Sequence, residues 1–190
     1  MTRGPTLPAH RLPPLPAPLD AFNAAPDHEA GALLLRCLHS PRWCRRIADH
    51  RPYPDVESLL AAADEAAYDL SPGDLAEALA GERLPRVPDG TYGAARTALS
   101  AAHATYEAKF GHAFVIYLGD TPPEETVDRV LEGIQSRWTN DPEEERAVVA
   151  EELRRLARGR LAERLRGAGQ CSSAAPPRGA TSPRGGAPGV

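Results

Sequence analysis

The chain has 190 residues, of which 42% are hydrophobic and 25% charged, a composition typical of a globular protein rather than a disordered one. The formal net charge of −4 argues against nucleic-acid binding as the main activity, because neutralising phosphates requires a concentrated basic surface. No apolar run approaches the roughly 20 residues that span a membrane, and the N-terminus lacks the apolar core of a secretory signal. We therefore expect a cytoplasmic protein that binds neither nucleic acid nor membrane.

Cysteine usage agrees with this location. Cys37, Cys44 and Cys171 are odd in number and show no CxxC spacing. Such cysteines indicate free, mostly buried thiols in a reducing compartment, and we expect no metal site.

The two ends differ in composition from the middle. Residues 1–18 contain six prolines and no helical period, and residues 167–190 are rich in Gly, Ala, Ser and Pro. Both compositions are typical of segments that do not pack into a core. We predict a disordered arm over 1–18, a helical domain over 19–166, and a disordered tail over 167–190.

Helix boundaries are marked by capping residues. Three polar residues that favour the N-cap position each precede a proline, which suits the first helical position: Ser40-Pro41, Ser71-Pro72 and Asp141-Pro142. Thr121 and Asp141 are each followed three residues later by a glutamate, the spacing of a capping box. Gly81 and Gly111 are candidates for the left-handed residue that ends a helix.

Apolar residues recur with a helical period across the middle of the chain. Helices are predicted near 27–39, 41–50, 56–63, 75–79, 99–110, 127–138 and 149–161. Ala113 to Leu118 is a strand-like run without a partner, so we expect a buried extended segment or part of a helix. The fold class is therefore all-α, a single-domain bundle of about seven to eight helices.

Several short strings appear in a specific order along the chain. They are Phe22-Asn23 with Pro26, Leu34–Trp43 (LLRCLHSPRW), Arg51-Pro52-Tyr53, Tyr106–Gly111 (YEAKFG) followed by Phe114-Val115-Ile116, and Arg137 with Asn140. Together they resemble the signature of the OHCU decarboxylase family, where OHCU is 2-oxo-4-hydroxy-4-carboxy-5-ureidoimidazoline. The resemblance runs from about Phe22 to Leu161.

The resemblance implies an all-α enzyme of urate degradation, a carbon–carbon lyase that decarboxylates OHCU to (S)-allantoin without a cofactor. It also implies substrate contacts from Arg137 and from the backbone of Phe114, Val115 and Ile116, and a homodimer. Family members place a catalytic histidine in an HPRIG-like turn and a glutamate in an S..EQ segment.

This sequence departs from the family at both catalytic positions. The turn should follow Leu79, but no histidine occurs between His50 and His103, so the HPRI portion is best aligned as deleted. The S..EQ segment aligns with residues 84–88, which puts Val87 where the glutamate should stand. Two functions stay open: the decarboxylase, and a non-catalytic or repurposed relative that binds a small ureide-like or other anionic ligand. A purely structural interaction module is a third, based only on the helices and the proline-rich arm.

Three residues are candidates for the missing chemistry. Arg137 offers a planar fork for a carboxylate or a ureide oxygen, or it is a surface arginine paired with an acid one turn away. His103 shares an apolar face with Leu99 and Tyr106, so it is either a proton donor in a pocket or, as we favour, a histidine at the edge of the core. Glu82 is the only acid near the lost turn, and we expect it to be a solvated loop residue rather than a catalytic one.

Overall fold

Helices make up all the regular secondary structure of residues 18–83 and 93–170, the part of the chain that the computed structural model describes. In chain order they are α1 (Pro18–Ala24), α2 (Asp27–Leu35), α3 (Pro41–Ala48), α4 (Val56–Tyr68), α5 (Pro72–Gly81), α6 (Gly93–Phe110), the 3₁₀ helix η1 (Pro123–Glu125), α7 (Thr126–Arg137) and α8 (Pro142–Gln170). The all-α prediction is confirmed. None of these helices is long and apolar enough to cross a membrane.

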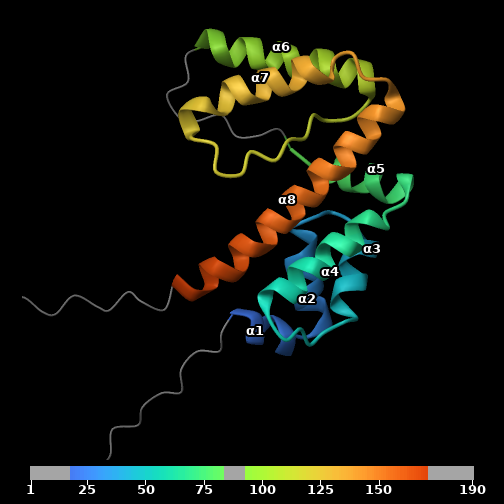
Figure 1. Ribbon diagram of the computed structural model, residues 1–190, viewed down its shortest axis with the longest axis vertical. Coiled ribbons are helices and arrows are strands. Elements are labelled where there is room, and N and C mark those ends of the chain that lie inside the picture. Colours follow the sequence, from blue (N-terminus) through green and yellow to red (C-terminus); the bar gives the residue numbers. More distant parts are fainter. Residues whose placement is uncertain (1–17, 84–92, 171–190) are drawn as a thin grey trace, which may run out of the picture.

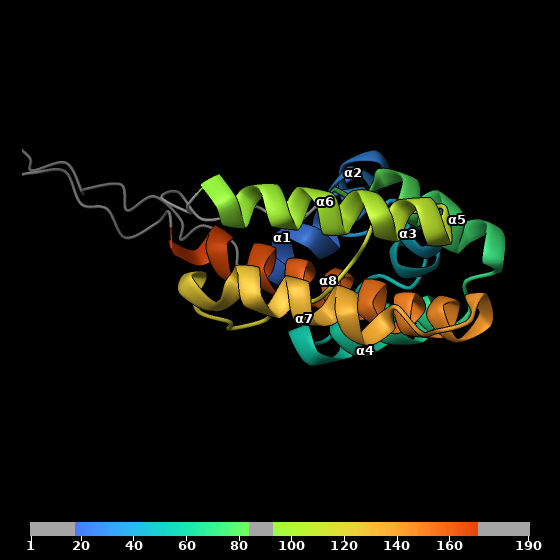
Figure 2. The ribbon, with the colours of Figure 1, turned by 90° about the horizontal axis from the view of Figure 1, so that it is seen from above.

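The helices form two groups on either side of α8 (Figure 1). Helices α1 to α4 lie against one side of α8, and the pair α6 and α7 lies beyond its other side (Figures 1 and 2). The pair is parallel: Lys109, at the end of α6, donates hydrogen bonds to the carbonyls of Trp138 and Asn140, just after α7. The chain must therefore return between the two helices, and residues 111–122 make this return crossing.

Each group has its own buried core. The larger core joins α1 to α5 with α8 and includes the fully buried Trp43, whose indole N–H donates to the carbonyl of Ala63 at 2.9 Å. The smaller core joins α6, α7 and the return crossing, and it consists of Leu99, Tyr106, Phe114, Val130 and Ile134. Burial of apolar area in these two cores is the main stabilising term of the fold.

Helix α8 takes part in both groups. One stripe of apolar side chains packs into the larger core: Val149, Leu153, Ala157, Leu161 and Leu165. Glu145 and Glu152, seven residues apart and so on one face, are buried on the side of α7. The two groups are consequently held in register by a single helix.

Most of the predicted helix starts are confirmed in detail. The Ser40 hydroxyl accepts from the N–H of Trp43, and Ser71 forms a capping box with Asp74. The Asp141 carboxylate accepts from the N–H groups of Glu143 and Glu144. Gly111 ends α6 with φ of +78°, a conformation that favours glycine.

Two local predictions are wrong. Gly81 is the last residue of α5 rather than a left-handed cap, and a Cβ there would lie 2.4 Å from the Cβ of His39. A glycine is needed here because the side chain of His39 lies too close to leave room for a Cβ, and not because of its backbone angle. Thr121 does not cap a helix either, because its hydroxyl donates to the carbonyl of Leu118 and η1 starts later, at Pro123.

The predicted boundaries of the domain differ slightly from those of the helices. Pro18 already belongs to α1, and α8 continues to Gln170, four residues past the expected end at 166. The rest of the predicted arm (1–17) and tail (171–190), together with Cys171, lies outside the described residues. Cys37 and Cys44 are buried free thiols, as predicted, and burial raises the pKa of Cys44 to about 12.

Candidate functional site

A cavity of about 360 Å³ lies between the return crossing and the C-terminal half of α8. Its walls come from the two residues after α5, the crossing, and three turns of α8. They are Glu82 and Arg83, the run Phe114 to Asp120, and Leu156, Gly159, Arg160, Glu163 and Arg166. The lining combines apolar surface with charges of both signs, so it offers a small polar ligand both kinds of contact.

The crossing passes the cavity as an extended chain. Side chains of Phe114, Ile116 and Leu118 pack with the α6–α7 core, whereas Val115 belongs to the larger core. Alternation with a period of two is the mark of extended backbone. The run from Ala113 to Leu118 is therefore the buried extended segment that the sequence predicted as one of two alternatives.

Glu82 and Arg160 form an ion pair in the wall of the cavity. Both carboxylate oxygens of Glu82 accept from the guanidinium of Arg160 at 2.7 Å, and the Glu82 side chain is only 5% exposed. These hydrogen bonds raise the pKa of Arg160, which also donates to the carbonyl of Cys37. The prediction that Glu82 is a solvated loop residue is wrong, because α5 ends against α8 and carries Glu82 onto Arg160.

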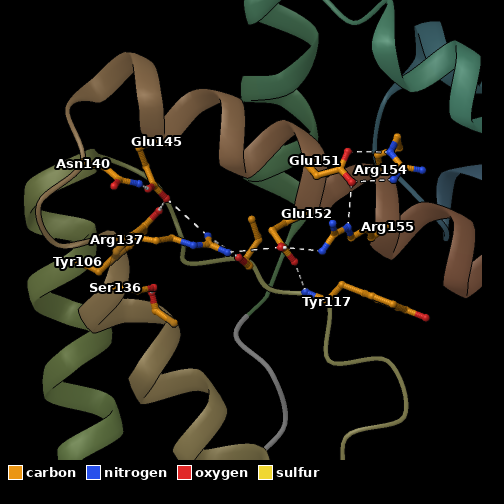
Figure 3. A network of polar contacts seen from close by, with 12 residues as sticks. Tyr106, Tyr117, Ser136, Arg137, Asn140, Glu145, Glu151, Glu152, Arg154 and Arg155 are labelled. Carbon is orange, nitrogen blue, oxygen red and sulfur yellow. Dashed lines mark hydrogen bonds and ion pairs between the residues drawn. The ribbon is translucent and has the colours of Figure 1, made fainter.

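Arg137 is buried on the other side of the crossing, with 7% of its surface exposed (Figure 3). Its Nη1 donates to the carbonyl of Val115 at 2.9 Å and lies 3.5 Å from Glu145, while Nη2 lies 3.7 Å from Glu152. The guanidinium carbon stands 4.7 Å above the ring of Phe114. The interpretation of Arg137 as a surface arginine paired within its own helix is therefore wrong, since its partners are on α8 and on the crossing.

The acids that pair with Arg137 make further hydrogen bonds. Glu145 accepts from the hydroxyl of Tyr106 and from the amide of Asn140, and Glu152 accepts from the backbone N–H of Tyr117. Burial, followed by the hydrogen bond to Glu145, raises the pKa of Tyr106, so its hydroxyl stays a donor. We call Arg137, Glu145, Glu152 and Tyr106 the buried network.

His103 lies in the α6–α7 core rather than at the cavity. It is 4% exposed, its ring centroid is 6.1 Å from that of Phe114, and its Nε2 has no hydrogen-bond partner among the described residues. Burial lowers the pKa of His103, which favours the neutral ring.

Of the residues predicted for the site, the structure brings four to the cavity wall: Glu82, Phe114, Val115 and Ile116. Arg137 and His103 do not line it. The segment 84–88, with Val87 in the place of the family's glutamate, lies outside the described residues.

Arg160 was not among the residues predicted from the sequence. Its neighbours Arg154 and Arg158 both pair with Asp64 on α4, away from the cavity. Residues two apart on a helix point in nearly opposite directions, so Arg160 faces the cavity instead. Gly159 was the available signal, because a glycine inside a helix often marks the close approach of another segment.

The comparisons with known proteins agree on one family. The family model of OHCU decarboxylase matches residues 23–87 and 90–162. A crystal structure of OHCU decarboxylase in the presence of (S)-allantoin superimposes with a TM-score of 0.61 at 18% identity, covering 75% of this chain and 99% of that one. A crystal structure of (S)-allantoin synthase gives a TM-score of 0.59 at 18% identity, covering 77% of this chain and 53% of the other, so the present chain spans about half the length of that protein.

At 18% identity the structural similarity supports the fold alone, and the assignment to a family rests on the family model. A search of curated protein sequences found no match. The family model covers well over half of the chain, and the ordered set of sequence strings falls within it. The chain therefore belongs to the OHCU decarboxylase family.

Proposed function

We propose that the protein acts in urate degradation and decarboxylates OHCU to (S)-allantoin in the cavity between the crossing and α8. The cavity is the observation that carries the proposal. One of its walls is the crossing, which contains the Phe114-Val115-Ile116 string that resembles the family's, and Arg160 lies in the opposite wall. Its volume of about 360 Å³ suits a ligand with a single five-membered ring and a ureido arm.

The reaction requires three things of the site. The carboxylate must be held while its bond to the ring carbon breaks and CO2 leaves. The electron pair from that bond stays on the ring, and a proton must then reach the resulting centre from one face to give the S product. A guanidinium is suited to the first task because its planar donor edges match an oxyanion. We assign that task to Arg160, whose Nη1 and Nη2 bond Glu82 but whose Nε bonds no other described residue.

The crossing supplies backbone groups for the ureide. Ile116 lines the cavity, and its N–H and C=O make no hydrogen bond to any other described residue. A backbone amide offers one donor and one acceptor side by side, which matches the N–H and C=O of a ureide or imidazolone. We assign to Ile116 the orientation of the ligand's amide edge.

Glu82 is the group we assign to proton transfer, because it is the cavity carboxylate closest to Arg160. Its pairing with Arg160 fixes the position of both side chains. A positioned acid or base contributes roughly 10²- to 10⁴-fold to such a reaction. Glu82 thus stands in for the acid–base groups that this chain lacks at the family's usual positions.

The second candidate is a ligand-binding protein without catalysis. It is favoured by one observation: both oxygens of Glu82 are already bonded to Arg160, so the carboxylate is engaged within the wall rather than directed at a ligand. Such a protein would bind the same ureide-like anions through Arg160 and Ile116.

The test is to supply freshly generated OHCU to the purified protein and follow (S)-allantoin by circular dichroism. Arg160→Met and Glu82→Gln are the test variants, and Arg158→Met is the control, because Arg158 lies on the same helix but pairs with Glu57 and Asp64 away from the cavity. We expect acceleration by the wild type and by Arg158→Met, with a loss on the order of 10²-fold in Glu82→Gln.

Each alternative has its own outcome. Binding of (S)-allantoin in calorimetry without acceleration of the reaction supports the non-catalytic protein. A folded wild type that neither binds nor accelerates contradicts both functions.

A further inference from the structure

The buried network lies directly against the wall of the cavity without entering it. Arg137 holds the carbonyl of Val115, and Glu152 holds the N–H of Tyr117. These two groups flank Ile116, the residue to which we assigned the ligand's amide edge. Any effect of the network on a ligand in the cavity therefore passes through the backbone of the crossing.

The geometry of the peptide bond determines what the network does to Ile116. In a planar trans peptide the C=O of one residue and the N–H of the next point in opposite directions. The only cis peptide among the described residues is Arg51-Pro52, so the peptides of the crossing are trans. Because Val115 C=O points to Arg137, the N–H of Ile116 points away from it. Because Tyr117 N–H points to Glu152, the C=O of Ile116 points away from that acid.

Both polar groups of Ile116 are thus directed to the edge of the crossing opposite the network, and Ile116 lines the cavity. We propose that Arg137 and Glu152 are positioning residues, which fix the two peptide planes around Ile116 and so pre-orient its N–H and C=O toward a bound ureide. The proposal rests on the function proposed above, since it assumes that the ligand occupies this cavity.

Burial and charge suit the network to this task. Glu145 is 1% exposed and Arg137 7%, so solvent does not compete for the contacts that hold the crossing. A guanidinium can bond Val115 and both acids at once because its donors form a rigid fork. Tyr106 donates to the Glu145 oxygen that faces Arg137, and Asn140 donates to the other oxygen, which keeps the acid pointed at Arg137 (Figure 3).

The decisive variants are at Glu152, where the loss of one hydrogen bond can be separated from the loss of charge. Glu152→Gln removes the charge but keeps an oxygen that accepts from Tyr117 N–H, whereas Glu152→Met removes both. Glu151→Met is the matched control, because this neighbouring acid pairs with Arg154 and Arg155 and does not touch the crossing. Arg137→Lys keeps a cation between the two acids, which guards the fold, but lacks the fork.

Three readouts and one stability control are needed. Hydrogen exchange of the Ile116 and Tyr117 amides, measured by NMR without ligand, reports the order of the crossing. Calorimetry with (S)-allantoin as the probe reports binding, and the OHCU assay separates kcat from KM. Urea unfolding of each variant corrects for global stability.

We expect Glu152→Met to speed exchange of the Tyr117 amide by at least tenfold and to weaken allantoin binding by about tenfold, because small errors of position are costly in a preorganised site. In Glu152→Gln both the exchange rate of the Tyr117 amide and the affinity for allantoin should stay close to those of the wild type. Arg137→Lys should resemble Glu152→Met, and Glu151→Met should match the wild type. Unchanged exchange in a folded Glu152→Met, or equal losses in Glu151→Met, overturns the proposal. If the wild type binds no allantoin while the exchange pattern is as expected, the proposed ligand is wrong and the positioning of the crossing stands.

Discussion

The ion pair between Glu82 and Arg160 should be a strong one, and a double-mutant cycle measures its strength. The cycle consists of Glu82→Gln, Arg160→Met and the two changes together. Two unit charges about 4 Å apart interact by roughly 4 kcal/mol at the effective dielectric constant of about 20 that suits protein surfaces. Glu82 is 5% exposed but Arg160 is 34% exposed, so solvent screens part of this attraction. We expect a coupling free energy of about 2 kcal/mol.

The single variants should differ from each other. Arg160→Met leaves a nearly buried carboxylate without its partner, and such a break in a buried pair costs about 3 kcal/mol. Glu82→Gln leaves the more exposed Arg160, which retains the carbonyl of Cys37 as an acceptor, and it should cost less, about 2 kcal/mol. The measurement is urea unfolding at pH 7, followed by far-ultraviolet circular dichroism at low and high salt.

The pair Arg46–Asp69 provides the control, since its side chains are 46% and 48% exposed. Its coupling should be at most about 0.5 kcal/mol and should vanish in 1 M salt, where the Debye length is about 3 Å. A coupling near zero for Glu82–Arg160, or one as sensitive to salt as the control, would refute the argument that this pair fixes the cavity wall.

Three further perturbations test the cores and the end of α6. His103→Leu should raise the free energy of unfolding at pH 7 by about 1 kcal/mol, because it removes the unbonded Nε2 from the core. Burial lowers the pKa of His103 in the folded protein, so below the unfolded-state pKa of about 6.5 the unfolded chain binds more protons than the folded one. The free energy of unfolding of the wild type should therefore fall as the pH drops through that value. Acid titrations of stability should show no such fall from this residue in His103→Leu. Trp43→Phe should cost about 2 kcal/mol in urea unfolding, from the lost bond to Ala63 and the space left in the larger core, and a loss below 0.5 kcal/mol would mean that the site repacks. Gly111→Ala should cost about 1 kcal/mol at a φ of +78° and lower the melting temperature, whereas an unchanged melting temperature would show that the turn shifts to another conformation.

The helices were predictable because their signals are local. Ser40, Ser71 and Asp141 each cap a helix within three residues of their own position, so no knowledge of the rest of the chain was needed. The spacing of His103 with Leu99 and Tyr106 predicted the helix face that they share, although the expected place was the edge of the core and the side chain is 4% exposed.

The site was harder to predict because its parts come together only through packing between distant helices. Glu82 and Arg160 are 78 residues apart, and nothing in the sequence around Glu82 has a period that reveals a buried side chain. Arg137 was identified by its place in the family strings, but a string does not tell which side of the crossing the side chain approaches. The side chain of Arg137 contacts Val115 from the side away from the cavity because its two acidic partners, Glu145 and Glu152, lie on that side of α8.

The sharing of α8 between the two cores has a consequence for synthesis on the ribosome. Helix α8 extends about 43 Å at 1.5 Å per residue and is the last element of the described chain to be made. Helices α2 to α4, which can pair early, expose Leu59 and Ala63 of α4 until α8, which packs on α4, has been made. At roughly 5–20 residues per second the delay between Tyr68 and Leu165 is about 5–20 s. Nascent chains stalled before α8 should therefore be far more sensitive to protease than the finished protein.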